Sequence, residues 1–205
     1  MEQNQDILVG RRAEKKQLEA IMASEEAEFV VVYGRRRVGK TFLVNSFFND
    51  NYAFKLTGLA KKSKREQLAN FTASLNRYHE GKKYKKPRTW YEAFDQLRDL
   101  LEKVKVKGKR IVFIDELPWM DSRGSNLVSA LEHFWNDWAS TQNDMVLIVC
   151  GSATSWITKK ILKNRGGLHN RVTQKLYIHP FTLAECKEYL QSRNILMEDK
   201  EIAEC

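Results

Sequence analysis

The sequence Gly34-Arg35-Arg36-Arg37-Val38-Gly39-Lys40-Thr41 lies directly behind the apolar run 29–33 and is followed by the apolar stretch 42–48. This order matches the strand–GxxxxGK[ST]–helix pattern of a P-loop. Its two glycines let backbone N–H groups turn inward around phosphate oxygens, and the helix N-terminus adds partial positive charge. Lys40 then reaches the β- and γ-phosphates, and the Thr41 hydroxyl is a ligand for Mg²⁺. The pattern predicts a nucleoside triphosphate site; a basic turn without a ligand is the alternative, which the flanking strand and helix disfavour.

Apolar runs and amphipathic stretches alternate along the rest of the chain. Helical spacing of apolar side chains predicts helices between the runs, and two of these helices begin at Ser63–Glu66 and Thr89–Glu92, which have the pattern of capping boxes. Unbroken apolar runs are typical of parallel strands covered on both faces. The predicted fold class is α/β, a three-layer αβα sandwich around a central, mainly parallel five-stranded sheet. Its strands are expected near residues 29–33, 52–56, 111–114, 145–150 and 175–178.

The composition limits the class of protein. A chain of 205 residues with 42% hydrophobic residues can build one large domain, or one domain and the start of a second. No apolar run approaches the ~18 residues that cross a bilayer, and the N-terminus does not resemble a signal peptide. We therefore expect a cytoplasmic protein without a membrane partner. Three widely spaced cysteines suggest neither disulfides nor a zinc site.

Positive charge is concentrated in one segment. Eleven lysines and arginines but only two glutamates lie between Lys55 and Arg88, so this segment carries all of the net charge of +9. Such a segment could contact nucleic acid or another acidic partner. A solvated, flexible basic loop explains the charge equally well, and both readings stay open.

Two further motifs accompany the P-loop. The apolar run 111–114 ends in Asp115 and Glu116, and carboxylates at the carboxyl end of a buried strand lie at the sheet edge where α/β folds bind ligands. Asp115 is expected to hold Mg²⁺, and Glu116 to orient or deprotonate the attacking water. After the run 145–150 comes Ser152, expected on the strand between the other two and close to the γ-phosphate. Thr154 is the second candidate, and an N-cap is the structural alternative for either residue.

Together the three motifs resemble Walker A, Walker B and sensor 1 of an AAA+-like P-loop ATPase, with Glu116 as the catalytic glutamate. Three other segments resemble the archaeal-type ATPase family, which is related to STAND and replication-initiator ATPases. These segments are 8–12 with Glu14 and Leu18, 115–119, and 167–171 with 179–181. The resemblance covers nearly the whole chain and implies binding of ATP or ADP with Mg.

The resemblance also implies roles that the residues alone do not. Val9, Gly10 and Arg11 would meet the adenine and ribose edge of the nucleotide. Arg171 would be an arginine finger acting in cis or in trans, with a structural salt bridge as the alternative; Arg165 is a weaker candidate. Arg35, Arg36 and Arg37 are expected to face solvent or a neighbouring subunit.

The resemblance divides the chain into an ATPase core, residues 1–180, and the beginning of a truncated helical lid, residues 181–205. Because family members continue beyond this lid, weak hydrolysis is expected of this piece. The implied function is Mg-dependent ATP hydrolysis coupled to conformational change, and a homo-oligomer is among the implied partners. The alternatives are a nucleotide-gated, STAND-like switch with little turnover, or a DNA-associated ATPase that uses the segment from Lys55 to Arg88.

Overall fold

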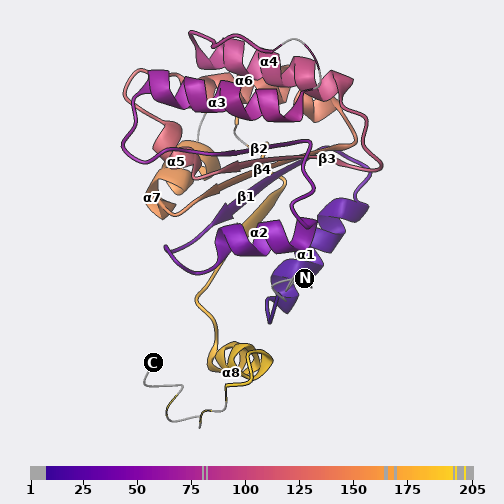
Figure 1. The fold of residues 1–205 in the computed structure, drawn as a ribbon, viewed down its shortest axis with the longest axis vertical. Helices are drawn as coiled ribbons and strands as arrows, with labels where there is room; N and C mark the ends of the chain where they lie inside the picture. The colour runs from indigo at the N-terminus through magenta and orange to yellow at the C-terminus, as the bar shows by residue number, and fades with distance from the viewer. Residues whose placement is uncertain are drawn as a thin grey trace.

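The computed structural model describes residues 8–79, 81, 83–163, 166–168, 170–195, 197 and 201. Within them, five strands form one sheet in the order β2-β3-β4-β1-β5, and every neighbouring pair is parallel (Figure 1). The predicted parallel sheet is therefore confirmed, with β4 between the P-loop strand β1 and the acidic strand β3. The strands are β1 (Glu28–Tyr33), β2 (Phe54–Thr57), β3 (Arg110–Asp115), β4 (Met145–Gly151) and β5 (Gln174–Tyr177).

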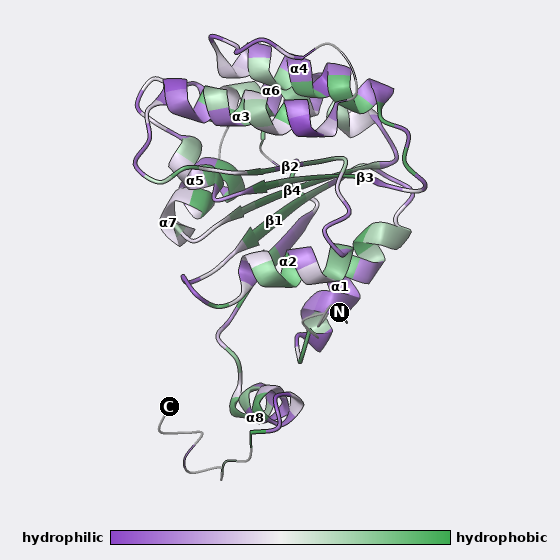
Figure 2. Ribbon diagram, viewed as in Figure 1, coloured by the Kyte–Doolittle hydropathy of each residue, from purple (hydrophilic) through white to green (hydrophobic). Residues whose placement is uncertain are grey.

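Helices cover both faces of the sheet, which confirms the three-layer arrangement. One face carries α3 (Lys64–Tyr78), α4 (Trp90–Lys103) and α6 (Leu127–Asp137), and the other carries α1 (Arg12–Ala23) and α2 (Lys40–Phe48) (Figure 1). Alternate residues of β1 enter different cores: Phe29 and Val31 pack in the larger cluster, Val30 and Val32 in the smaller one. An apolar side chain is thus needed at each position from 29 to 32, which explains the unbroken apolar run there. Figure 2 shows the same hydrophobic concentration in the sheet.

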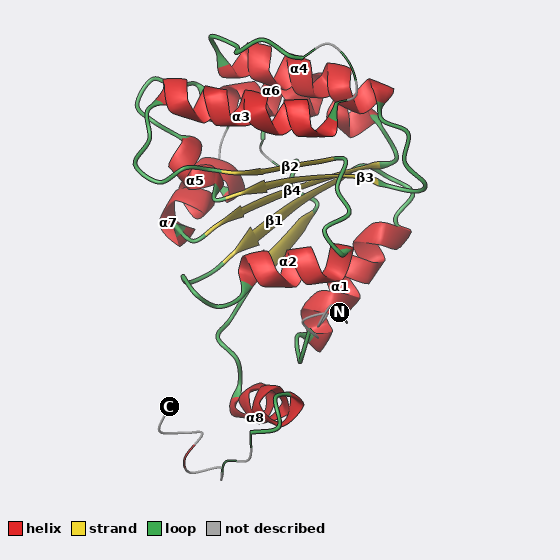
Figure 3. Ribbon diagram, viewed as in Figure 1, coloured by secondary structure: helices red, strands yellow, loops and turns green. Residues whose placement is uncertain are grey.

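Several short elements surround the carboxyl edge of the sheet. Helix α5 (Leu117–Met120) follows β3, and α7 (Thr154–Ile157) follows β4. The residues after β4 do not form one regular α-helix, because α7 changes to a π-helix, η2 (Thr158–Leu162). Figure 3 shows α8 (Leu183–Ser192) standing away from the sheet, below α1 and α2, and none of its residues is buried. A one-turn 3-10 helix, η1 (Ala139–Thr141), follows α6.

Helix starts follow the predicted capping, with one correction. Ser63 and Glu66 form a complete capping box at α3, and Thr182 with Glu185 forms another at α8. At α4 only half of the predicted box exists: Thr89 Oγ1 accepts the Glu92 N–H at 3.1 Å, but the Glu92 carboxylate accepts the N–H of Arg88 instead. In the part of the chain that the structure describes, no helix is both long and apolar enough to span a membrane.

Candidate functional site

The P-loop joins the carboxyl end of β1 to the start of α2, as the sequence predicts. Gly34 has φ 150°, and a Cβ there would come within 2.4 Å of the Ile178 carbonyl oxygen on the neighbouring segment. Gly39 has φ 84° and is the N-cap residue of α2. Both positions favour glycine, the first through close backbone approach and the second through its positive φ. The loop can therefore direct backbone N–H groups toward an anion at the helix N-terminus.

Lys40 is buried, with 5% of its surface exposed, although it carries a full charge. Its Nζ donates a hydrogen bond to the Arg35 carbonyl at 2.7 Å, which closes the loop. An ammonium group has three N–H donors, and this carbonyl is the single acceptor that it contacts among the described residues. A buried ammonium with donors to spare is suited to an anionic ligand, since burying a charge without partners is costly.

Thr41 and Asp115 meet in front of the P-loop. The Thr41 hydroxyl donates to Asp115 Oδ2 at 2.9 Å, and Asp115, at the end of β3, is 4% exposed. Its other carboxylate oxygen accepts the N–H of Glu116 at 2.9 Å. The sequence-predicted pair of Mg²⁺ ligands is thus brought together. A hydroxyl and a carboxylate are hard oxygen donors, which fit Mg²⁺ when phosphates and water complete its coordination.

Glu116 lies beside Ser152, because β3 and β4 are neighbours. Ser152 Oγ donates to Glu116 Oε2 at 3.2 Å, and the Ser152 N–H approaches the same oxygen at 3.4 Å. Glu116 itself has φ 47°, a left-handed conformation that is uncommon for a non-glycine residue and worth attention at a functional site. No side-chain cap hydrogen bond starts α7, so the Ser152 hydroxyl orients Glu116 rather than capping that helix. Thr154 is the first residue of α7.

A buried thiol lies behind these carboxylates. Cys150, the last residue but one of β4, is fully buried. Burial raises the pKa of its thiol well above the ordinary value, and the nearby Asp115 carboxylate raises it further. The thiol is therefore neutral and behaves as a small hydrophobic side chain.

Two cavities meet at the start of α2. One of about 400 Å³, called the polar cavity here because most of its lining residues are charged or polar, lies at the P-loop; its lining includes Arg36, Lys40, Thr41, Glu116 and Trp119. The other, of about 430 Å³, is lined by an apolar and aromatic set that includes Val9, Val38, Phe42, Phe181 and Tyr189. Both are also lined by Arg37 and Gly39, and Phe42 borders the two. Each volume is in the range of small-molecule sites.

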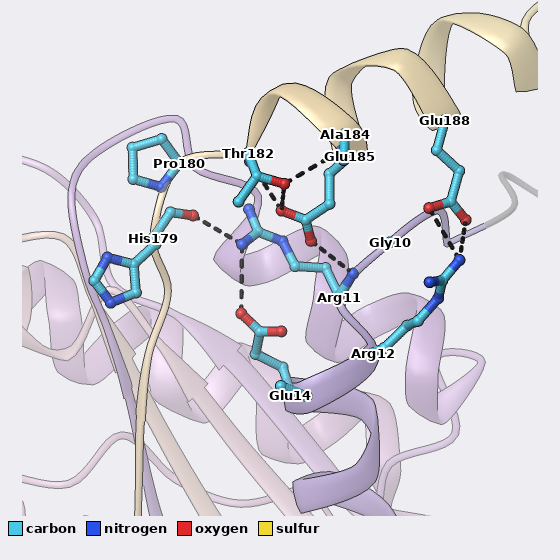
Figure 4. Close-up of a pocket in the computed structure, with 11 residues that line it drawn as sticks. Gly10, Arg11, Arg12, Glu14, His179, Pro180, Thr182, Ala184, Glu185 and Glu188 are labelled. Atoms are coloured by element: carbon cyan, nitrogen blue, oxygen red, sulfur yellow. Dashed lines mark hydrogen bonds and ion pairs between the residues drawn. The ribbon is translucent and has the colours of Figure 1, made fainter.

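Arg11 is buried and connects the P-loop, the segment after β5 and helix α8; Figure 4 shows its contacts with His179 and Glu185. Its guanidinium donates to the Val38 carbonyl of the P-loop at 2.9 Å and to the His179 carbonyl at 2.8 Å, and it stacks over the Phe181 ring at 4.4 Å. The sequence-based expectation was a contact with the nucleotide's ribose edge. In the structure the guanidinium contacts these main-chain carbonyls and the Glu14 carboxylate, and Arg11 lines the apolar cavity, so the expected contact with the nucleotide stays a prediction.

The same residue ties α8 to the core. The Arg11 N–H donates to Glu185 Oε1 at 3.0 Å, and Gly10 lies against the Glu185 side chain. Burial raises the pKa of the Glu185 carboxyl, but backbone hydrogen bonds from Thr182 and Arg11 outweigh it and hold the pKa below its ordinary value. Next to it, Arg12 forms an exposed ion pair with Glu188 at 3.4 Å. Figure 4 shows these contacts around a cavity of about 470 Å³.

Arg171 is far from the P-loop of its own chain. It is exposed and lies in the turn before β5, where its N–H donates to the Leu168 carbonyl. Gln174 pairs with Val30, four residues before Gly34, which is about 13 Å along a strand. Arg171 is three residues further back, at the amino edge of the sheet. A role in cis therefore does not fit this geometry, and the role in trans and the structural role both stay open. Arg165 lies outside the described residues.

The basic segment does not form one patch. Lys64 and Arg65 begin α3, whereas the lysines at 83, 85 and 86 follow its end. The 15 residues of α3 separate the two groups by about 22 Å. Lys55 and Lys62 are each paired with a carboxylate, at 2.6 Å and 3.0 Å. The charge seen in the sequence is thus divided between the two ends of one helix.

Sequence reasoning did not find the aromatic lining of the site. Phe42, Trp119, Phe181 and Tyr189 all border one of the two cavities. In the structure Phe42 and Tyr189 are each 40% exposed. Their grouping depends on how the P-loop helix α2 and the segment from Phe181 through α8 lie around one cavity, which no local sequence pattern reveals.

Comparisons with known proteins agree with this arrangement. A model of the family described as "ATPase domain predominantly from Archaea" matches residues 8–203. An uncharacterized protein of Methanocaldococcus jannaschii is 28% identical over 184 residues, which are 89% of this chain and 38% of that protein.

Two solved structures share the fold. A Walker-type ATPase of Pyrococcus abyssi has a TM-score of 0.65 at 19% identity, over 96% of this chain and 62% of that one. The structure of Drosophila ORC bound to DNA has a TM-score of 0.64 at 15% identity, over 96% of this chain and 49% of that one. Identities this low concern the fold alone. The chain spans less than two thirds of the length of each of these three proteins.

Proposed function

We propose, from the premise that the chain belongs to the family of ATPase domains found predominantly in Archaea, that it binds ATP with Mg²⁺ and hydrolyses the γ-phosphate. The observation that carries the proposal is the 2.9 Å contact between the Thr41 hydroxyl and the Asp115 carboxylate. It unites the P-loop helix with the acidic strand at the edge where α/β sheets bind ligands.

The two cavities divide the nucleotide between them. The β- and γ-phosphates occupy the polar cavity, where Lys40 and the backbone of the P-loop supply donors. The base occupies the aromatic cavity, where Phe42, Phe181 and Tyr189 offer flat apolar surface. When bound, Mg²⁺ held by Thr41 and Asp115 neutralises charge on the phosphate oxygens.

Glu116 is the base in this proposal. It accepts a proton from water as the water oxygen attacks the γ-phosphorus, and Ser152 holds the carboxylate in place through the 3.2 Å hydrogen bond. The bond between the γ-phosphorus and the bridging oxygen breaks, and its electron pair leaves with ADP. The products are ADP and inorganic phosphate.

The contacts of Arg11 favour a second candidate function, that of a nucleotide-gated switch with little turnover. The Arg11 guanidinium contacts the Val38 carbonyl of the P-loop, and its backbone N–H contacts Glu185 of α8. A ligand that reorders the P-loop would therefore act on α8 through one residue, whether or not ATP is hydrolysed. Such coupling requires that the two nucleotide states differ in these contacts.

Single-turnover hydrolysis separates the two functions. Glu116→Gln is expected to slow hydrolysis by at least about 100-fold, the range for loss of a general base, while ATP binding persists. Asp95→Asn, at an exposed carboxylate on α4, is the matched control and should behave as wild type. Wild type and Glu116→Gln that bind ATP but are equally inert would reject hydrolysis and support the switch.

A further inference from the structure

The three consecutive arginines of the P-loop have side chains without partners. Arg35, Arg36 and Arg37 are all exposed, and their guanidinium groups make no hydrogen bond, ion pair or ring contact with any described residue. Most other arginines of the site region are engaged, as Arg11 and Arg12 are. Three adjacent like charges repel one another, so a polyanion would relieve this repulsion.

The three side chains differ in where they lie. Arg36 lines the polar cavity, together with Lys40, Thr41 and Glu116, and does not line the aromatic one. Arg37 borders both cavities, and Arg35 lines neither. Of the three arginines, Arg36 is thus the one that lines the polar cavity without bordering the aromatic one.

The phosphoryl group that is transferred needs positive charge, and the expected source is remote. An arginine that neutralises charge developing on this group is a common part of such sites. Arg171, the sequence-based candidate, is at the amino edge of the sheet and cannot serve its own P-loop. Building on the proposed function, we propose that Arg36 supplies this charge in cis, so that each chain carries its own finger within the P-loop.

The step is the hydrolysis described above, with the role of Arg36 added. As the new bond from the water oxygen to the γ-phosphorus forms and the bond to the bridging oxygen breaks, negative charge spreads over the three equatorial oxygens and onto the leaving ADP. The Arg36 guanidinium donates hydrogen bonds to these oxygens, and the proton of the water goes to Glu116. Arg36 exchanges no proton because its guanidinium stays charged.

The first experiment compares hydrolysis with binding of a mimic of the transferred group. Arg36→Ala is expected to lower kcat by at least about 100-fold, with ADP affinity within about 3-fold of wild type. It should also lose the tight complex of ADP, Mg²⁺ and aluminium fluoride, measured as nucleotide retained on gel filtration. Arg36→Lys should keep part of both properties, because it retains the charge and loses the planar fork. Arg88→Ala, at an exposed arginine beyond α3, is the control and should match wild type.

The second experiment distinguishes cis from trans. Arg36→Ala and Glu116→Gln, each inert alone, are mixed in equal amounts. A finger that acts in cis leaves the mixture inert, since every site lacks either Arg36 or its base. Recovery of activity in the mixture would overturn action in cis.

Three other results would also decide the role of Arg36 or the proposed function. Equal losses of ADP, ATP and aluminium fluoride complex in Arg36→Ala would reduce Arg36 to uniform phosphate binding and overturn the proposal. Wild-type turnover in Arg36→Ala would do the same, while leaving the proposed function intact. A wild type that binds ATP without turnover would reject hydrolysis, and the aluminium fluoride complex would then decide the role of Arg36; a wild type that binds no nucleotide rejects both.

Discussion

Replacing Arg11 by alanine should destabilise the protein far more than replacing its neighbour Arg12. The Arg11 guanidinium donates two hydrogen bonds to main-chain carbonyls at 2.8 and 2.9 Å and is 5% exposed. A hydrogen bond to a charged group contributes about 1.5–3 kcal/mol, so the low end for two such bonds is about 3 kcal/mol. Stacking over Phe181 adds about 0.5–2 kcal/mol. We expect Arg11→Ala to lower the free energy of unfolding by about 3.5–5 kcal/mol.

Arg12→Ala is the matched control. Arg12 forms a single ion pair at 3.4 Å, with 83% of its side chain exposed. Exposed pairs of this kind contribute about 0–1 kcal/mol, so the control should lose under about 1 kcal/mol. The assay is urea unfolding followed by tryptophan fluorescence, with the midpoint and the slope m compared at equal protein concentration. A loss under about 1 kcal/mol for Arg11→Ala, or equal losses in the two variants, would refute the connector role of Arg11.

Three further predictions concern other parts of the molecule. Gly34→Ala places a Cβ 2.4 Å from the Ile178 carbonyl, so we expect a fall in thermal midpoint by calorimetry; an unchanged midpoint would show that the segment yields freely. Because the folded-state pKa of Glu185 is lowered, its contribution to stability is present above its unfolded pKa and is lost as pH falls through its folded pKa. Glu185→Gln should therefore flatten the decline of stability below about pH 4, measured by urea unfolding at several pH values; an equally steep decline would contradict this. The basic segment is split by α3, and its second group comprises Lys83, Lys85 and Lys86. Reversing the charge of these three lysines should therefore leave any duplex DNA affinity within about 3-fold at fixed salt. A larger loss of affinity would show that this group is a nucleic-acid site.

The layered fold could be predicted because it depends on local patterns. The central residues of β1, β3 and β4 form unbroken apolar runs, which are typical of parallel strands buried on both faces. The sequence predicts the second strand at residues 52–56, whereas β2 spans Phe54–Thr57; both bounds differ because a short edge strand carries little periodicity. Helix α5 was missed for a similar reason: four residues that include Pro118 cannot show a helical repeat.

The candidate site was predictable where spacing in the sequence determines proximity. Thr41, Asp115, Glu116 and Ser152 meet because parallel strands end at the same edge, and each was expected there. The position of Arg11 was not accessible to this reasoning, since its partners His179 and Glu185 lie 168 and 174 residues away. Long-range side-chain contacts depend on the packing of α8, which no motif specifies.

Nucleotide binding at the P-loop can be measured by equilibrium dialysis of labelled ATP against the folded chain in Mg²⁺. We expect saturable binding of about one nucleotide per chain, weakened at least about 10-fold by Lys40→Ala, since Lys40 supplies donors to the phosphates. Binding that does not saturate, or that Lys40→Ala leaves unchanged, would contradict this expectation.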